Sequence, residues 1–315
     1  MADRKQPRLV ALGDLLLDVV VVPERPIELG TDVPGRLAFR RGGSAATTTA
    51  GFVRAGGAAV LITSLGSDAW AGRLAASLRG DGVRVHAARQ PGPSGRLAAL
   101  IDERGERSFV TERGAADGLS AGDIDAAWLR GADVLHVPAY SLFAEPIGAA
   151  ALHAATLARE NGAMVSCDLS SQGPLLAYGV SRSRARIAEL APDVLFANRD
   201  EAAAMLHAKG RRAWAGLLAH APLVVVKDGA WGCRVLWRHP PADAVRQLDV
   251  AAERARHEDT TGAGDAFAAG FLFSMLGAGG LPDVLHDQAM RRAALAGHRA
   301  AADALRHGRR EVTLR

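Results

Sequence analysis

Lysine, cysteine and tyrosine are all scarce in this sequence of 315 residues, which has two cysteines and two tyrosines. The only lysines are Lys5, Lys209 and Lys227, so almost all of the basic charge comes from arginine. Aromatic residues make up 5% of the chain, and basic and acidic residues are interspersed without a basic run. Nucleic-acid-binding domains usually carry a clustered basic surface with aromatic residues that stack on bases. We therefore expect no nucleic-acid partner, although the formal net charge is +4.

Long apolar runs are also absent. None reaches the roughly 18 residues that a membrane span requires, because Asp18 interrupts even the stretch 15–22. Residues 1–5 lack the pattern of a signal peptide. Cys167 and Cys233 each lie in an apolar, strand-like run without a Cys-x-x-Cys spacing, which is typical of reduced cysteines in a protein core. We expect a cytoplasmic protein without a membrane partner.

The most informative stretch is residues 259–267, where a polar run gives way at Gly264 to an apolar sequence compatible with a helix. A helix is therefore predicted to begin near residue 263. The first N–H groups of a helix have no partner within it, and the helix dipole adds partial positive charge at that end. Gly262 and Gly264 would let an anion approach this backbone closely. The stretch is typical of a phosphate cradle.

Asp265 falls in the first turn of this predicted helix. Its carboxylate is suited either to cap the helix or to take a proton from a nucleophile. A Rossmann dinucleotide motif also uses closely spaced glycines, but it follows a hydrophobic strand and ends in Gly or Ala. Here a polar run precedes the glycines and Phe267 ends the stretch, which argues against that motif. The choice between cap and base stays open on these residues alone.

The chain is long enough for one large α/β domain or two small ones. Strand-like and helix-like segments alternate along most of it, which predicts a doubly wound, mostly parallel sheet with helices on both faces. The predicted strands are 9–12, 59–65, 134–137, 164–168, 194–197 and 223–226. The predicted helices are 45–55, 72–79, 147–160, 182–190, 199–207, 211–219 and those after residue 263.

Two segments break this alternation. Residues 19–40 combine an extended run with a stretch rich in Pro and Gly, and residues 94–113 contain two short strands around a turn at 103–106. Together they predict a small antiparallel β layer outside the main sheet. A second hairpin is predicted around residues 230–237.

Several polar clusters follow predicted strands, where α/β sheets bind ligands. Asp14 and Asp18 flank the end of the first strand, Gly42-Gly43-Ser44 opens a helix, and Asn198-Arg199-Asp200-Glu201 leads from a strand into a helix. Each cluster also has a simpler explanation as a cap or a turn. Their shared location with the 259–267 stretch favours a single active site.

These motifs resemble the ribokinase-like, or pfkB-type, carbohydrate kinase family over essentially the whole chain. Asp259-Thr-Thr-Gly-Ala-Gly-Asp265 is similar to the C-terminal signature of that family, and Gly42-Gly43-Ser44-Ala45-Ala46-Thr47 followed by Gly56-Gly57 resembles its N-terminal signature. Further matches occur in the family's order: Gly66-x-Asp68, Ser94-Gly95, Gly105-Glu106-Arg107, Asn198-x-x-Glu201 and Asp228-Gly229-Ala230-Trp231-Gly232.

The resemblance implies an enzyme that moves the γ-phosphate of ATP to a hydroxyl of a sugar or sugar-like substrate. Asp265 matches the family's catalytic base, and Gly262, Ala263 and Gly264 match its anion hole. Asn198 and Glu201 match the motif that organises Mg²⁺ and the phosphates.

For the remaining positions the resemblance implies binding functions. Gly229 matches a nucleotide-side loop, and Asp18, Gly42 and Gly43 match substrate-binding positions. In many relatives the loop that corresponds to Asp259 and Thr261 binds a monovalent cation, usually K⁺.

The whole chain, residues 1–315, is then expected to be one ribokinase-like domain. Its lid would consist of segments 19–40 and 94–113, and in some relatives such a lid also forms a homodimer interface.

The sequence departs from the family pattern at three positions. Thr47 stands where relatives usually carry an Asn that contacts sugar hydroxyls, and Thr lacks the amide of that Asn. Leu16 replaces a polar residue of ribokinase, and Ala139 replaces a common Gly. The substrate therefore stays open, with a nucleoside kinase or a catalytically inactive, small-molecule-binding relative as alternatives. A P-loop, clustered zinc ligands and a Gly-x-Ser-x-Gly elbow are all missing from the sequence.

Overall fold

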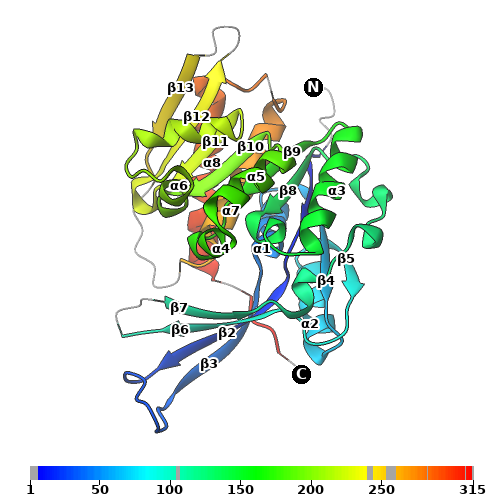
Figure 1. The fold of residues 1–315 in the computed structure, drawn as a ribbon, viewed down its shortest axis with the longest axis vertical. Helices are drawn as coiled ribbons and strands as arrows, with labels where there is room; N and C mark the ends of the chain where they lie inside the picture. The colour runs from blue at the N-terminus through cyan, green and yellow to red at the C-terminus, as the bar shows by residue number, and fades with distance from the viewer. Residues whose placement is uncertain are drawn as a thin grey trace.

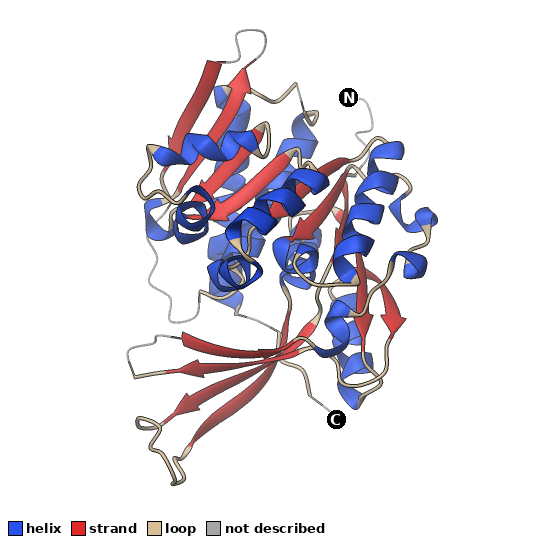
Figure 2. Cartoon of the chain, in the orientation of Figure 1, coloured by secondary structure: helices blue, strands red, loops and turns tan. Residues whose placement is uncertain are grey.

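The computed structural model describes residues 6–103, 107–239, 244–252, 260–281, 283–308 and 310–313. They form a large sheet flanked by helices and a second, smaller sheet that projects from one end of the molecule (Figure 1). Figure 2 shows helices in front of and behind the large sheet, while the small sheet stands apart below them. The predicted α/β architecture with helices on both faces is confirmed.

Among the described residues, nine strands make up the large sheet, in the spatial order β13-β12-β11-β10-β9-β8-β1-β4-β5. Their bounds are β1 Arg8–Leu12, β4 Ala58–Leu65, β5 Arg84–Arg89, β8 Val134–Pro138, β9 Met164–Asp168, β10 Val194–Asn198, β11 Leu223–Lys227, β12 Cys233–His239 and β13 Ala244–Val250. Every pair from β5 to β11 is parallel, whereas β12 and β13 are added antiparallel. The winding direction reverses between β1 and β8, and ligands bind at such a switch point in open α/β sheets.

The helices divide between the two faces of this sheet. The α-helices are α1 Ser44–Arg54, α2 Ala69–Gly80, α3 Ile147–Glu160, α4 Gln172–Tyr178, α5 Val180–Leu190, α6 Arg199–Leu206, α7 Ala263–Ala278 and α8 Asp287–His307. Short 3₁₀ helices are η1 Gly114–Asp117, η2 Ala121–Asp123, η3 Ala126–Leu129, η4 Ala139–Leu142, η5 Ala213–Ala219 and η6 Gly229–Trp231. Helices α1, α2, α7 and α8 contribute to one hydrophobic core, and α3 to α6 contribute to the other.

Strand β1 shows why the sheet is covered on both sides. Leu9 and Ala11 belong to the core under α1 and α7, whereas Val10 and Leu12 belong to the opposite core. Successive residues of a strand point to opposite faces. An unbroken apolar run is therefore the pattern expected of a buried parallel strand.

The small sheet has the order β3-β2-β6-β7, with β2 Leu16–Pro23, β3 Gly35–Gly42, β6 Arg96–Ile101 and β7 Arg107–Glu112. Both predicted segments, 19–40 and 94–113, contribute to it. The prediction of a purely antiparallel layer is wrong, because the central pair β2–β6 is parallel. The two outer pairs are hairpins, but the chain passes from β2 to β6 through β3, α1, β4, α2 and β5, and such a long connection allows parallel pairing.

Two local predictions need correction, and one helix was missed. Residues 211–219 form mainly the 3₁₀ helix η5 and not an α-helix. The buried Trp214 and Leu217 are three residues apart, and this spacing fits a 3₁₀ turn as well as it fits an α-helix. Helix α4 was not predicted. The hairpin predicted at 230–237 is instead formed by β12 and β13, and its connection lies outside the described residues.

A short C-terminal segment, residues 310–313, lies along the base of the small sheet. Arg41 N donates a hydrogen bond to Arg310 O over 2.9 Å, and Val312 N donates to Phe39 O over 2.9 Å. Arg310 also lies 3.0 Å from Asp81. This segment therefore joins the end of β3 to the C-terminal end of α2 (Figure 1).

The described part of the chain contains no helix with the length and hydropathy needed to cross a membrane. Cys167 and Cys233 are buried free thiols, as predicted. Burial raises the pKa of Cys233 to about 12, so this thiol stays protonated and unreactive near neutral pH.

Candidate active site

The glycine-rich helix start lies at the beginning of α7, as predicted. The helix begins at Ala263, and Gly262 precedes it with a φ of 80°. This left-handed conformation favours glycine, which has no Cβ to clash with the backbone. Phe267 and Phe271, further along α7, are buried in the core and hold the helix in place.

Asp265 is held by a neighbouring helix. Its Oδ1 accepts a hydrogen bond of 2.6 Å from Ser44 Oγ, the first side chain of α1. The residue at the N-cap is Gly262, and α7 has no side-chain cap hydrogen bond. The sequence left two functions open for Asp265, a helix cap and a general base. This geometry does not support the helix cap.

The surroundings of Asp265 make its carboxylate unusually basic. Burial, reinforced by the negative charge of Asp168, raises its pKa to about 8, although Ser44 and Lys227 oppose the shift. The residue keeps partial contact with solvent. A carboxylate with a pKa near the working pH is well matched to accept a proton during a reaction.

Close packing of α1 on α7 makes this contact feasible. A Cβ added to Gly51 of α1 would stand 3.0 Å from the Cβ of Ala269 in α7. Such a separation is tighter than ordinary van der Waals contact, so a larger residue would push the helices apart. The small residues of α1 therefore keep Ser44 within reach of Asp265.

Lys227 and Asp168 form an ion pair beside this helix start. Lys227 Nζ donates to Asp168 Oδ2 over 2.5 Å, and the two residues end strands β11 and β9. A Cβ built on Gly264 would lie 3.1 Å from the same Nζ, so the ammonium group stands next to the predicted anion hole. Sequence reasoning assigned no function to Lys227. The feature of the sequence that could have indicated a function is that Lys227, one of only three lysines, directly follows the apolar run 223–226.

Asn198 and Glu201 are bonded to each other at the end of β10. Asn198 N and Nδ2 donate to the two Glu201 oxygens over 2.7 and 2.6 Å, and Asn198 Oδ1 accepts from Glu201 N over 2.9 Å. This arrangement is a capping box on α6, so the interpretation of the motif as a helix cap is correct. Burial raises the pKa of Glu201 to about 7, against the opposing charge of Lys227. Asn198 pairs with Lys227 in the β10–β11 register, which brings this motif to the same sheet edge.

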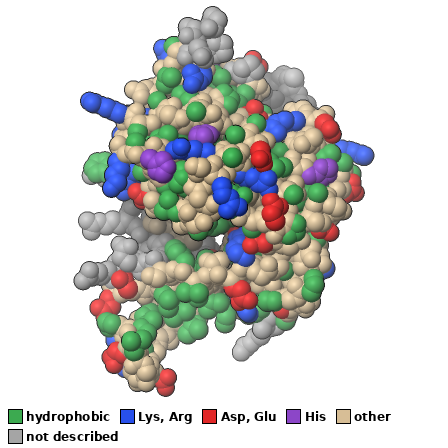
Figure 3. Space-filling view, in the orientation of Figure 1, with side chains coloured by type: hydrophobic (Ala, Val, Ile, Leu, Met, Phe, Trp, Pro, Cys, Tyr) green, Lys and Arg blue, Asp and Glu red, His purple; other side chains and the backbone are tan. Residues whose placement is uncertain are grey.

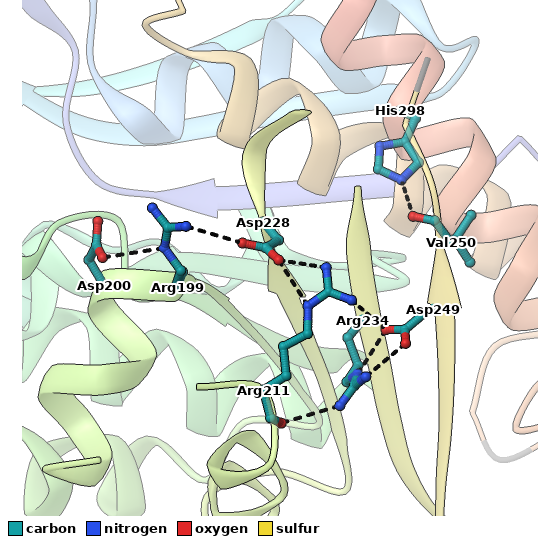
Figure 4. A network of polar contacts seen from close by, with 8 residues as sticks. All are labelled: Arg199, Asp200, Arg211, Asp228, Arg234, Asp249, Val250 and His298. Carbon is teal, nitrogen blue, oxygen red and sulfur yellow. Dashed lines mark hydrogen bonds and ion pairs between the residues drawn. The ribbon is translucent and has the colours of Figure 1, made fainter. Parts of the chain in front are cut away.

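Gly229 lies in a tight loop after β11, with a φ of 57°. Asp228 N donates to Gly232 O over 2.8 Å and closes the loop. The Asp228 carboxylate accepts a hydrogen bond of 2.6 Å from Arg211 and lies 3.8 Å from Arg199 Nη1 (Figure 4).

A cavity of about 360 Å³ opens beside this loop. Its lining residues are Arg199, Gly210, Arg211, Trp214, Asp228 and Trp231. Figure 4 shows how Arg211, in addition, approaches Asp249, which is paired with Arg234.

Asp18 lies over Gly42, in the small sheet. A Cβ on Gly42 would overlap the Asp18 carboxylate, and a Cβ on Gly43 would overlap the backbone oxygen of Asp14. Gly43 also has a φ of 101°, which other residues rarely adopt. Both glycines are thus required by the close approach of β2 and the β1–β2 connection.

Asp14 links the first strand to two other segments. Its Oδ1 accepts from Ala45 N over 3.3 Å at the start of α1, and its Oδ2 accepts from Arg113 Nη1 over 2.9 Å. Arg113 also donates to Asp117 over 2.9 Å. The role of Arg113 was not predicted, because residues 14 and 113 are far apart in the sequence.

The other predicted positions are less completely described. Thr47 Oγ1 donates to Gly43 O over 2.8 Å, and the Thr47 methyl group would lie 3.1 Å from a Cβ on Gly262. Thr47 therefore touches both signature motifs. Thr261 directly precedes Gly262, whereas Asp259 lies outside the described residues.

The contacts above gather most predicted positions at one edge of the sheet, around the start of α7. A doubly wound α/β sheet with a second small sheet and a carboxylate at a glycine-rich helix start is the architecture of a ribokinase-like phosphotransferase. The sequence profile described as the pfkB family of carbohydrate kinases matches residues 6–308. The chain therefore belongs to the pfkB family of carbohydrate kinases and is an enzyme of that kind.

Individual relatives differ in the substrate for which they are named. An ATP-dependent ribose-1-phosphate kinase from Halopiger xanaduensis is 31% identical over 85% of this chain and 85% of its own. Fructokinase-1 from Zea mays is 29% identical over 84% of this chain and 81% of its own.

Solved structures share the fold at lower identity. Adenosine kinase from Sinorhizobium meliloti has a TM-score of 0.80 at 24% identity, covering 96% of this chain and 94% of its own. A candidate ribokinase II from E. coli, in complex with ATP and Mg²⁺, has a TM-score of 0.76 at 22% identity, covering 97% and 94%. At these identities the likeness concerns the fold.

Proposed function

We propose that this protein transfers the γ-phosphate of ATP to a hydroxyl group of a sugar or sugar-like substrate, with Asp265 as the general base. The backbone of Gly262, Ala263 and Gly264 would serve as the anion hole. The observation that carries this proposal is the Asp265 carboxylate itself. This carboxylate accepts a hydrogen bond from Ser44, and its pKa is raised to about 8. It lies at the glycine-rich start of helix α7.

In the proposed step, the substrate hydroxyl oxygen attacks the γ-phosphorus and its proton passes to Asp265. The bond between the γ-phosphorus and its bridging oxygen breaks, and ADP leaves with the electron pair. The N–H groups at the start of α7 would stabilise the negative charge on the transferred group. Asp18, over Gly42, would accept hydrogen bonds from substrate hydroxyls.

Mg²⁺ fits the residues at the end of β10. Within the described residues no three His, Cys, Asp or Glu side chains are grouped to hold a metal ion. Mg²⁺ bound with a nucleotide needs no such group, because it keeps water molecules and phosphate oxygens as ligands. Both Glu201 oxygens already accept hydrogen bonds from Asn198, so these two residues would hold the ion through water. When bound, Mg²⁺ would neutralise part of the phosphate charge.

A monovalent cation, usually K⁺ in relatives, is proposed at the loop that contains Asp259 and Thr261. Thr261 adjoins Gly262, so a cation there would act on the conformation of the anion hole. Replacement of K⁺ by a large organic cation such as tetramethylammonium should lower kcat without changing the melting temperature. An unchanged kcat would exclude this cation.

The substrate is best identified with a panel assayed for ADP release. The panel should contain fructose, ribose, ribose 1-phosphate and adenosine, with Asp265→Asn as the control for contaminating kinases. ADP release with a free sugar supports the first proposal, and release with adenosine alone would favour the nucleoside kinase. Small-molecule binding without any ADP release would indicate an inactive relative.

We also propose that residues 1–315 act as one cytoplasmic domain whose lid, segments 19–40 and 94–113, mediates a homodimer. By register, Phe39, Val19, Ala98 and Val110 form one cross-strand row and share a face of the small sheet. Phe39 and Val110 are 40% and 65% exposed, and Figure 3 shows hydrophobic side chains gathered over this sheet. Apolar surface of this kind is typical of interfaces. Sedimentation equilibrium should give a dimer for the wild type and a monomer for Val110→Asp.

A further inference from the structure

The ammonium group of Lys227 occupies a position that its ion pair alone does not explain. Lys227 ends β11, and its side chain crosses the end of β10 to reach Asp168 on β9. The same nitrogen stands beside Gly264, where a Cβ would approach it to 3.1 Å. A cation therefore lies next to the first N–H groups of α7 at the carboxyl edge of the sheet.

Three acidic side chains lie around Lys227. Asp168 and Glu201 are fully buried, and Asp265 lies at the start of α7. Burial disfavours the ammonium form, but the charges of Asp168 and Glu201 raise the pKa of Lys227 above its ordinary value. Lys227 is thus a permanent cation among acidic side chains that, when ionised, would repel a phosphate.

Two observations separate Lys227 from a purely structural partner of Asp168. The Asp168 side chain is 1% exposed, whereas the Lys227 side chain keeps 16% of its surface accessible. Lysine is also rare in this chain, where arginine supplies nearly all other positive charge. An ammonium is a compact point charge, whereas the broader guanidinium of arginine would crowd Gly264.

We propose that Lys227 is a further catalytic residue, whose ammonium contacts the phosphoryl group as it passes from ADP to the substrate oxygen, with Asp168 as the positioning residue. This inference rests on the proposed function. The substrate oxygen bonds to the γ-phosphorus, its proton goes to Asp265, and ADP departs with the electrons of the cleaved bond. Throughout this step Lys227 neither gains nor loses a proton, and it offsets the charge on the transferred oxygens.

The test compares Lys227→Met with the double variant Asp168→Asn/Lys227→Met, in which the charge of Asp168 is removed together with that of its partner. Lys227→Met alone leaves Asp168 uncompensated and is expected to lower the melting temperature. The double variant should recover the melting temperature, yet its kcat should remain about 10²–10³-fold below wild type, the usual loss for one preorganised donor. Lys209→Met, an exposed lysine, is the matched control and should behave as wild type.

Nucleotide binding gives a second readout that does not require turnover. Because the ammonium is proposed to contact the γ-phosphate, the double variant should lose the preference for ATP over ADP in calorimetric Kd values, while ADP binding stays within about threefold. A double variant with wild-type kcat and an unchanged ATP preference would show that Lys227 serves only to neutralise Asp168. If the wild type releases no ADP with any panel member, the proposed function fails and this inference fails with it. If the wild type is active and the double variant is equally active, only the proposed role of Lys227 is overturned.

Discussion

Ser44 Oγ lies 2.6 Å from Asp265 Oδ1, and this hydrogen bond joins two residues that are 221 positions apart in the sequence. Ser44 belongs to the N-terminal signature and Asp265 to the C-terminal one. The contact fixes the carboxylate at the start of α7 without using it as a helix cap. The predicted effects of substitution at this pair differ accordingly from those expected of a capping residue.

Asp265→Asn should lower kcat by about 10²–10⁴-fold, because the amide keeps the shape of the side chain but accepts no proton. Its melting temperature should stay at or above that of the wild type, because the raised pKa of Asp265 shows that the folded surroundings disfavour the ionised carboxylate, and the amide carries no charge. Kinetics and thermal unfolding on one preparation test both statements. Asp287→Asn, in the first turn of α8, is the control and should leave kcat unchanged. A near wild-type kcat in Asp265→Asn would exclude the general base.

The pH dependence of kcat/KM should follow the ionisation of Asp265. With a pKa of about 8, the base is increasingly protonated below pH 8, so activity should fall about tenfold per pH unit on the acid side and level off above. Ser44→Ala removes a hydrogen bond that favours the carboxylate, so its acid limb should move to higher pH. An acid limb that is identical in both proteins would contradict this assignment.

The same raised pKa has a consequence for stability. A carboxyl group whose pKa is higher in the folded than in the unfolded protein binds its proton more tightly when folded, so the free energy of unfolding should decrease as pH rises between about 4 and 8. Asp265 contributes to this decrease through its pKa of about 8. Denaturant titrations at pH 5 and pH 8 should show a smaller loss in Asp265→Asn than in the wild type. An equal loss in the two proteins would place the pKa of Asp265 near its ordinary value.

Gly42→Ala should weaken substrate binding, because the new Cβ would displace the Asp18 carboxylate. Loss of a hydrogen bond to a charged group costs about 1.5–3 kcal/mol, which corresponds to a rise in KM of roughly 10- to 150-fold. Gly72→Ala, in α2, introduces a Cβ with no atom within 4 Å and serves as the control. Unchanged KM in Gly42→Ala would mean that Asp18 does not bind the substrate.

Thr47→Asn should change the order in which the panel of substrates is preferred, by roughly 1–3 kcal/mol between substrates. Thr47 adjoins Gly43 and Gly262, so a larger amide there would reach toward both signature motifs. Thr156→Asn is a matched control, because Thr156 Oγ1 also donates to a carbonyl four residues earlier but lies exposed on α3. KM values that keep their order in Thr47→Asn would show that this residue faces away from the substrate.

The start of α7 and most of the parallel sheet could be predicted because their signals are local: a change of polarity at Gly264, or an unbroken apolar run such as β1. The ion pair of Lys227 with Asp168 could not, because it depends on β9, β10 and β11 being neighbours. The parallel pairing of β2 with β6 was missed for the same reason. The position of Arg113 beside Asp14 likewise requires knowledge of how the small sheet joins the large one.

Residues 310–313 lie beyond the region that the family profile matches, which ends at residue 308. Yet Arg310 O and Val312 N complete hydrogen bonds with Arg41 and Phe39 at the end of β3. An expression fragment that ends at residue 308 would therefore lose these backbone hydrogen bonds to β3, although it would keep every signature motif. The region matched by sequence similarity therefore ends a few residues before the last backbone contact with the small sheet, which is the part of the molecule proposed as the lid.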